Sequence, residues 1–143
     1  MELIARNWIV QTEVGLLSKE QLIQLADDYI TENDEFPDWM IKISLSESLA
    51  REPKLDLILE PITLKDAQLV AKELLTLYIN HSITIPKIGQ VAEKLYLALE
   101  WGSEAFNLFI WVSDEVDLIN DDNKSEIEFK ENIQKVLFEI IAL

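Results

Sequence analysis

The sequence predicts an all-α protein: a single compact domain of about six helices over residues 1–143, packed as an antiparallel helical bundle. Glycine and proline are sparse, with three and four residues respectively, so few residues of the kind that interrupt helices are present. Apolar residues recur at intervals of three and four in several segments, which is the spacing of one helix face. Short connections between such segments favour antiparallel neighbours.

Three helices are expected in the N-terminal part of the chain. The first ends near Gly15, because glycine readily adopts the left-handed conformation that closes a helix. The second begins after Ser18, since Ser18 and Gln21 have the spacing of a capping box, in which two side chains satisfy free backbone N–H groups reciprocally. The third begins at Pro37, because the missing N–H of proline is harmless in the first helical turn.

Four further helices are expected after a connector at residues 44–59. Their starts are marked by Thr63, by the neighbourhood of Pro86, by Ser103 and by Ser125. Serine and threonine are favoured before the first turn because their hydroxyls accept a hydrogen bond from a free N–H there. The pattern therefore predicts where each helix begins.

The tryptophans are expected to serve mainly in the core. Residues 105–112 are apolar nearly all round, which is typical of a central helix. Trp8, Trp101 and Trp111 lie in or beside apolar helical segments and are interpreted as core residues. Trp39 stands among acidic residues, and either anchors a helix start or serves as an aromatic anchor in an acidic interface.

Charge is distributed unevenly along the chain, and this is the main functional clue. The first acidic stretch, residues 20–41, and the second acidic stretch, residues 95–123, each carry seven acids and no lysine or arginine. Together they account for nearly all of the net charge of -15. Charge gathered in this way predicts a surface of negative sign, and therefore a basic partner.

Composition excludes several functional classes. The chain has no cysteine, which rules out disulfides, thiolate zinc sites and cysteine catalysis. No cluster of lysine and arginine is present, so direct binding to nucleic acid or to an anionic membrane is not expected. No signal peptide and no apolar run of about 20 residues is recognisable, so we expect a soluble cytoplasmic protein.

No catalytic or metal-binding motif stands out. His81 is the only histidine and follows a predicted helix, so a structural or inert role is expected. EF-hand loops beginning at Asp117 or Asp121 both lack the glycine required at position six. The three glycines are too far apart for a phosphate-binding loop. We therefore expect no cofactor, no metal and no enzymatic activity, although a pair of carboxylates could serve a small hydrolase.

The N-terminal part resembles a known class of protein. Trp8, the pattern Ala-Asp-x-x-Ile at residues 26–30 and the acidic, tryptophan-containing segment at residues 34–44 look like a helical N-terminal module of small bacterial proteins. Acidic helical chains of this size are similar to immunity proteins, which neutralise toxins of interbacterial competition. The resemblance implies a non-enzymatic inhibitor that binds one cognate toxin, often a basic nuclease.

These observations predict an inhibitory binding protein of the immunity or antitoxin type. Two alternatives stay open beside the hydrolase: a nucleic-acid mimic that binds DNA-binding proteins, and a helical domain whose acidity serves only solubility. The state of assembly, monomer or dimer, is also open. The residues predicted to bind the partner are Asp34, Glu35, Asp38, Trp39, Asp114, Glu115, Asp117, Asp121 and Asp122.

Overall fold

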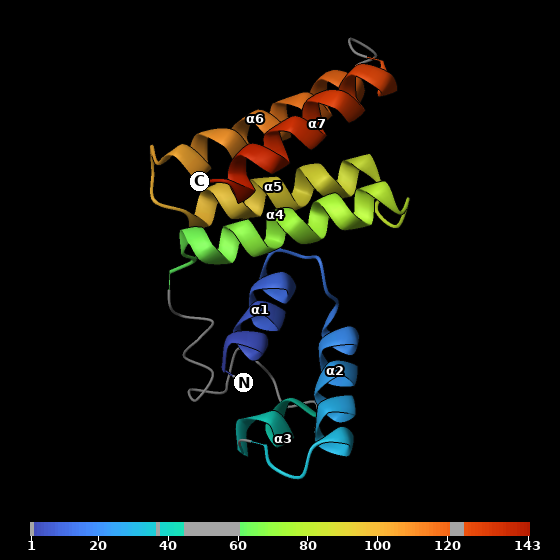
Figure 1. Ribbon diagram of the computed structural model, residues 1–143, viewed down its shortest axis with the longest axis vertical. Coiled ribbons are helices and arrows are strands. Elements are labelled where there is room, and N and C mark those ends of the chain that lie inside the picture. Colours follow the sequence, from blue (N-terminus) through green and yellow to red (C-terminus); the bar gives the residue numbers. More distant parts are fainter. Residues whose placement is uncertain (1, 37, 45–60, 121–124) are drawn as a thin grey trace. The chain divides into compact units, whose positions relative to one another are not determined.

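The computed structural model describes residues 2–36, 38–44, 61–120 and 125–143, and all regular structure in these ranges is helical (Figure 1). This confirms the all-α prediction. Six of the helices in these ranges have 12 to 17 residues, and α3 has seven. The helices are α1 (Glu2–Glu13), α2 (Lys19–Glu32), α3 (Asp38–Ser44), α4 (Leu64–Ile79), α5 (Ile85–Ala98), α6 (Glu104–Asn120) and α7 (Glu126–Ile141).

The chain divides into two compact units. The N-terminal unit is Met1–Glu60, and the C-terminal unit is Pro61–Leu143. Each unit contains buried apolar residues of its own. The prediction of one domain over residues 1–143 stays a prediction.

In the N-terminal unit, the sequence signals for the first two helices are confirmed. Gly15 adopts a φ of 85°, and the N–H of Leu16 donates to the Gln11 carbonyl at 2.7 Å, which closes α1. At the start of α2, the Ser18 hydroxyl accepts from the Gln21 N–H at 3.1 Å, and the Ser18 N–H donates to the Gln21 side chain at 2.8 Å. The predicted capping box is therefore present.

A small core holds the N-terminal unit together. Trp8 is half-buried beside it, as expected for a core tryptophan, and its ring meets Tyr29 edge-on with ring centroids 6.3 Å apart. The Ser44 hydroxyl donates a hydrogen bond to the half-buried Asp27 carboxylate, which fixes the end of α3 to α2. The predicted start at Pro37 lies outside the described residues. The buried core residues are Ile9, Leu22, Ala26 and Met40.

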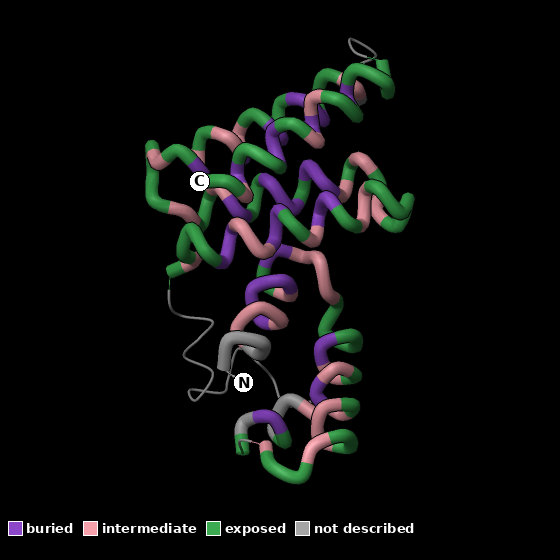
Figure 2. The backbone as a smooth tube through the Cα atoms, in the orientation of Figure 1, coloured by how far each residue is buried: buried purple, intermediate pink, exposed green. Residues whose placement is uncertain are grey.

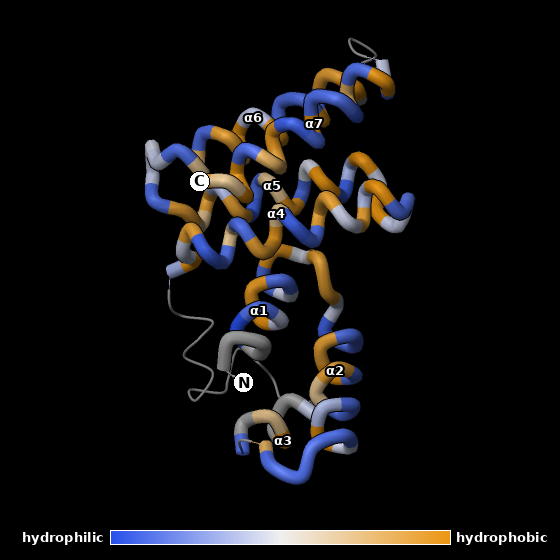
Figure 3. The backbone as a smooth tube through the Cα atoms, viewed as in Figure 1, coloured by the Kyte–Doolittle hydropathy of each residue, from blue (hydrophilic) through white to orange (hydrophobic). Residues whose placement is uncertain are grey.

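The C-terminal unit is an antiparallel arrangement of α4, α5, α6 and α7, each running opposite to the helix before it (Figure 1). Buried residues recur along the inward sides of these helices and coincide with the apolar positions (Figures 2 and 3). Gly89 lets α5 approach α6 closely, because a Cβ atom at Gly89 would lie 2.8 Å from a methyl group of Val116. Only a residue without a side chain fits there.

The helices of this unit begin where the sequence predicts. Thr63, Ser103 and Ser125 each accept a hydrogen bond from the N–H three residues later. Asp66 strengthens the first of these caps: it is 5% exposed and accepts from the Thr63 N–H at 2.8 Å. The helix expected near Pro86 begins one residue earlier, after Thr84. Local side-chain chemistry therefore sets each start.

His81 ends α4. Its φ is 57°, a left-handed conformation that side chains with a Cβ rarely adopt. The N–H of Ser82 donates to the Leu77 carbonyl at 2.8 Å, and the N–H of His81 donates to the Tyr78 carbonyl at 3.1 Å, which is the Schellman pattern of a helix end. His81 occupies the position where glycine is preferred, in agreement with the expected structural role.

Replacing His81 by glycine should raise the free energy of unfolding by about 1 kcal/mol, because glycine adopts the left-handed conformation without steric cost. Urea unfolding followed by circular dichroism measures this change. The matched control is Asn80→Gly, since Asn80 has a φ of -83° and gains nothing from glycine. A His81→Gly variant no more stable than wild type would contradict the assignment.

The expectation that Trp101 and Trp111 are core residues is wrong. Trp101 is 86% exposed and Trp111 is 36% exposed. Trp101 lies in the turn between α5 and α6 rather than within a helix. In α6 only one face is buried, so the segment is not surrounded by other helices as a central helix would be. The buried face consists of Ala105, Phe109, Val112, Glu115 and Val116.

Candidate partner-binding surfaces

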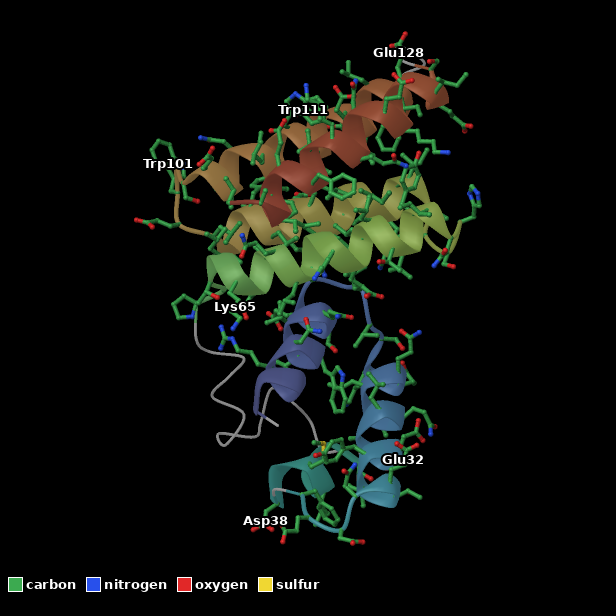
Figure 4. The ribbon with its side chains drawn as sticks, in the orientation of Figure 1. Glu32, Asp38, Lys65, Trp101, Trp111 and Glu128 are labelled. Carbon is green, nitrogen blue, oxygen red and sulfur yellow. The ribbon has the colours of Figure 1, made fainter. Side chains whose placement is uncertain are left out.

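The acidic residues of the N-terminal unit are exposed where α2 ends and α3 begins. Asp34, Glu35 and Asp38 are all exposed, and Glu32 is exposed in the last turn of α2 (Figure 4). Trp39 is the second residue of α3, and its side chain lies outside the described part of the structure. The structure thus brings the predicted acids of this unit together in one short exposed segment.

In the C-terminal unit, the outward face of α6 carries two of the predicted acids. Asp114 and Asp117 are exposed, as predicted, whereas Asp121 and Asp122 lie outside the described residues. Glu104 is exposed on the same helix, and so is Trp111 (Figure 4). One stripe of α6 contains residues separated by intervals of seven, three and four, namely Glu104, Trp111, Asp114 and Leu118.

Glu115 is not part of this exposed face. It is 5% exposed, and the side-chain amide of Asn132 on α7 donates to its carboxylate at 3.5 Å. Glu115 follows Val112 by three positions and directly precedes Val116, so the helical phase places it on the buried side. Its prediction as a partner-binding residue is therefore corrected.

Trp111 is a candidate binding residue that the sequence reasoning missed. It lines a surface pocket of about 250 Å³ between α6 and α7, together with Leu108, Lys135 and Glu139. An exposed tryptophan beside a hollow and surrounded by polar groups is a common form of interface anchor. The signal available in the sequence was its distance of three residues from Asp114, which placed both on one helix face.

Helix ends in both units leave acids where cations would be more stable. Neither α2 nor α6 has a basic residue in its last turn, and Glu32 and Asp117 are exposed there. The negative end of the helix dipole favours a cation at such positions by about 0.3–1 kcal/mol each. The placement of these acids therefore works against the stability of the helices that carry them.

A second pocket, of about 460 Å³, is lined by four side chains that could take part in proton transfer. Tyr78, His81, Glu126 and Lys130 line it together with several isoleucines. Burial, and secondarily the negative charge of Glu126, raise the pKa of Tyr78 above its ordinary value of 10.0. Within the described ranges no group of three or more His, Asp or Glu side chains is placed to hold a metal ion.

The raised pKa of Tyr78 predicts a stability change at alkaline pH. The unfolded chain loses this proton near pH 10.0 and the folded chain only at higher pH. The contribution of Tyr78 to the free energy of unfolding is therefore complete below pH 10.0. It is lost as the pH rises through the higher pKa of the folded state. Urea unfolding between about pH 9 and about pH 11 should show this fall.

Glu126→Gln should lower the pKa of Tyr78, because it removes the nearby negative charge. Ultraviolet titration of tyrosine, in a background with Tyr29 and Tyr96 replaced by phenylalanine, measures this pKa directly. Glu128→Gln in the same helix turn is the control. Equal shifts in the two variants would contradict a specific effect of Glu126.

None of the helices in the described ranges is both long enough and apolar enough to cross a membrane. Comparison of the chain with family models, with curated proteins and with solved structures finds no match.

Proposed function

We propose that this protein is a non-enzymatic inhibitory binding protein of the immunity or antitoxin type. It acts in the cytoplasm and neutralises a basic partner, such as a toxin nuclease domain, through its acidic surfaces. The observation that supports the proposal is the exposure of acids within stretches that lack lysine and arginine. These acids are Asp34, Glu35, Asp38, Asp114 and Asp117.

Inhibition would follow from charge complementarity. Exposed acids at an interface accelerate the encounter with a basic protein and orient it before contact. Trp111 then supplies an apolar anchor on α6, beside the exposed Asp114. An aromatic anchor surrounded by polar groups carries a large share of binding energy in many interfaces. A partner held in this way has its own basic active site covered.

The partner can be identified by capture from a lysate of the native host with the tagged protein at low and at high salt. The proposal expects a single basic protein that is retained at low salt and lost at high salt. Capture of several unrelated DNA-binding proteins would instead favour a nucleic-acid mimic. Failure to capture any protein at either salt concentration would leave the acidity as a solubility feature and would contradict the proposal.

Charge reversal of Asp34, Glu35 and Asp38 to lysine should slow association with that partner by about tenfold and flatten its dependence on salt. Stopped-flow fluorescence measures both quantities. An association rate that does not change across a salt series would contradict electrostatic steering.

The matched control reverses three acids outside the two acidic stretches, namely Glu13, Glu93 and Glu131, all of which are exposed. This control changes the net charge by the same amount. An equal loss of rate in both variants would show that total charge, and not the first acidic stretch, governs association.

A further inference from the structure

A third pocket lies in the C-terminal unit, where α4 begins and α5 turns toward α6. Its volume is about 600 Å³, within the range of sites that receive a ligand or a large side chain. Its apolar walls include Ile62 and Leu64 at the start of α4, Leu99 at the end of α5 and Ala105 at the start of α6. The pocket is therefore a largely apolar cavity at one end of the four-helix arrangement.

Large apolar residues are also exposed in, or next in sequence to, the segments that line this pocket. Trp101 is 86% exposed, Leu97 is 71% exposed and Leu64 is 43% exposed. Trp101 projects from the turn between α5 and α6 (Figure 4), and its ring lies 6.2 Å from that of Phe106, measured between ring centroids. Leu64 lines the pocket, and Leu97 and Trp101 are each next in sequence to a lining residue, so exposed apolar side chains accompany the pocket.

The charge around the pocket defines the chemistry of its occupant. Glu100 and Glu104 line it and are both exposed. Among the described residues that line it, none is lysine or arginine. Lys65 follows Leu64 on α4 and is not among the lining residues. An occupant with positive charge next to an apolar group complements both features.

We propose that this pocket receives a large apolar side chain of the basic partner, flanked in the partner by lysine or arginine that pairs with Glu100 and Glu104. This inference rests on the proposed function and adds to it a second apolar contact, separate from Trp111. A second copy of the chain is disfavoured as the occupant, because it would bring the same two glutamates and a further net charge of -15 to the pocket.

Short random peptides displayed on phage test the inference without knowledge of the partner. The full chain is immobilised, and the enriched peptides are sequenced and synthesised. We expect them to carry a large apolar residue next to lysine or arginine. Ala98 lines the pocket and is exposed, so Ala98→Phe should fill the pocket and weaken binding by at least about tenfold.

Three variants separate the pocket from the charge. Gln90→Phe, at an exposed position of the same helix, should leave peptide binding unchanged. Glu100→Gln combined with Glu104→Gln should weaken binding and flatten its dependence on salt. Ala98→Leu fills less space and replaces Ala98→Phe if circular dichroism shows that the latter has lost helix.

Two results would overturn the inference in different ways. Basic peptides that bind the pocket-filled variant as well as wild type would exclude the pocket, while the proposed acidic binding surface would stand. Enriched peptides without basic residues, or no enrichment at all, would exclude a basic occupant. The salt-dependent capture of a partner from lysate tests the proposed function separately.

Discussion

Replacement of Leu22 by alanine should lower the free energy of unfolding of the N-terminal unit by about 2–5 kcal/mol. Leu22 is completely buried and packs with Ile9, Ala26 and Met40. The substitution leaves a cavity, and the small surrounding core has few large side chains that could fill it. A unit of this size has a total stability of roughly 3–9 kcal/mol, so the loss would unfold a substantial fraction of it.

Urea unfolding followed by circular dichroism measures the loss, and two-dimensional NMR shows which amides are affected. Leu97→Ala is the matched control, because Leu97 is 71% exposed and its truncation leaves no cavity. A cost for Leu22→Ala that is no larger than the control would contradict the packing described for α1, α2 and α3.

The same experiment decides whether the chain is one domain. The prediction of a single domain over residues 1–143 requires the amides of both units to lose protection in one transition. Loss confined to the N-terminal unit, with the signals of the C-terminal unit retained, would show two independent domains and would contradict that prediction.

Replacement of Gly89 by alanine should destabilise the C-terminal unit by about 1–3 kcal/mol. The sign is opposite to the usual effect in helices, where alanine is favoured over glycine by about 1 kcal/mol. The added Cβ would lie 2.8 Å from one methyl carbon of Val116 and 3.2 Å from its Cβ. Val116 cannot turn aside easily, because a β-branched side chain in a helix strongly prefers one rotamer.

A double-mutant cycle tests this explanation. Val116→Ala removes the obstructing methyl groups, so the combination with Gly89→Ala should cost less than the two single changes added together. Gly102→Ala is the control: Gly102 has a φ of 77° and open space around it, so its cost arises from the backbone and should not depend on Val116. Strict additivity for Gly89 and Val116 would contradict the close approach of α5 and α6.

The helix starts could be predicted from sequence because their causes lie within four residues of each other. Ser18 and Gln21 satisfy each other's backbone groups, and Thr63 does the same with Asp66. Ser103 and Ser125 act in the same local way. Such signals do not depend on how the helices pack afterwards, and the all-α fold follows from them together with the apolar spacing.

Burial of individual residues was harder to predict, because it depends on distant partners. An apolar composition around Trp101 and Trp111 did not reveal that only one face of α6 is covered. Glu115 lies in an acidic stretch, yet its helical phase places it against Asn132 of α7. The role of Gly89 could not be recognised, since Val116 approaches it only after two helices have packed.

In the free protein, the acids in the last turns of α2 and α6 interact unfavourably with the negative ends of these helices. A basic partner that places lysine or arginine beside Glu32 and Asp117 would supply the cations that these helix ends lack. A cation at each helix end would contribute about 0.3–1 kcal/mol to the free energy of binding. The bound protein would therefore melt at a higher temperature than the free protein, and the partner would act as an external cap on its helices.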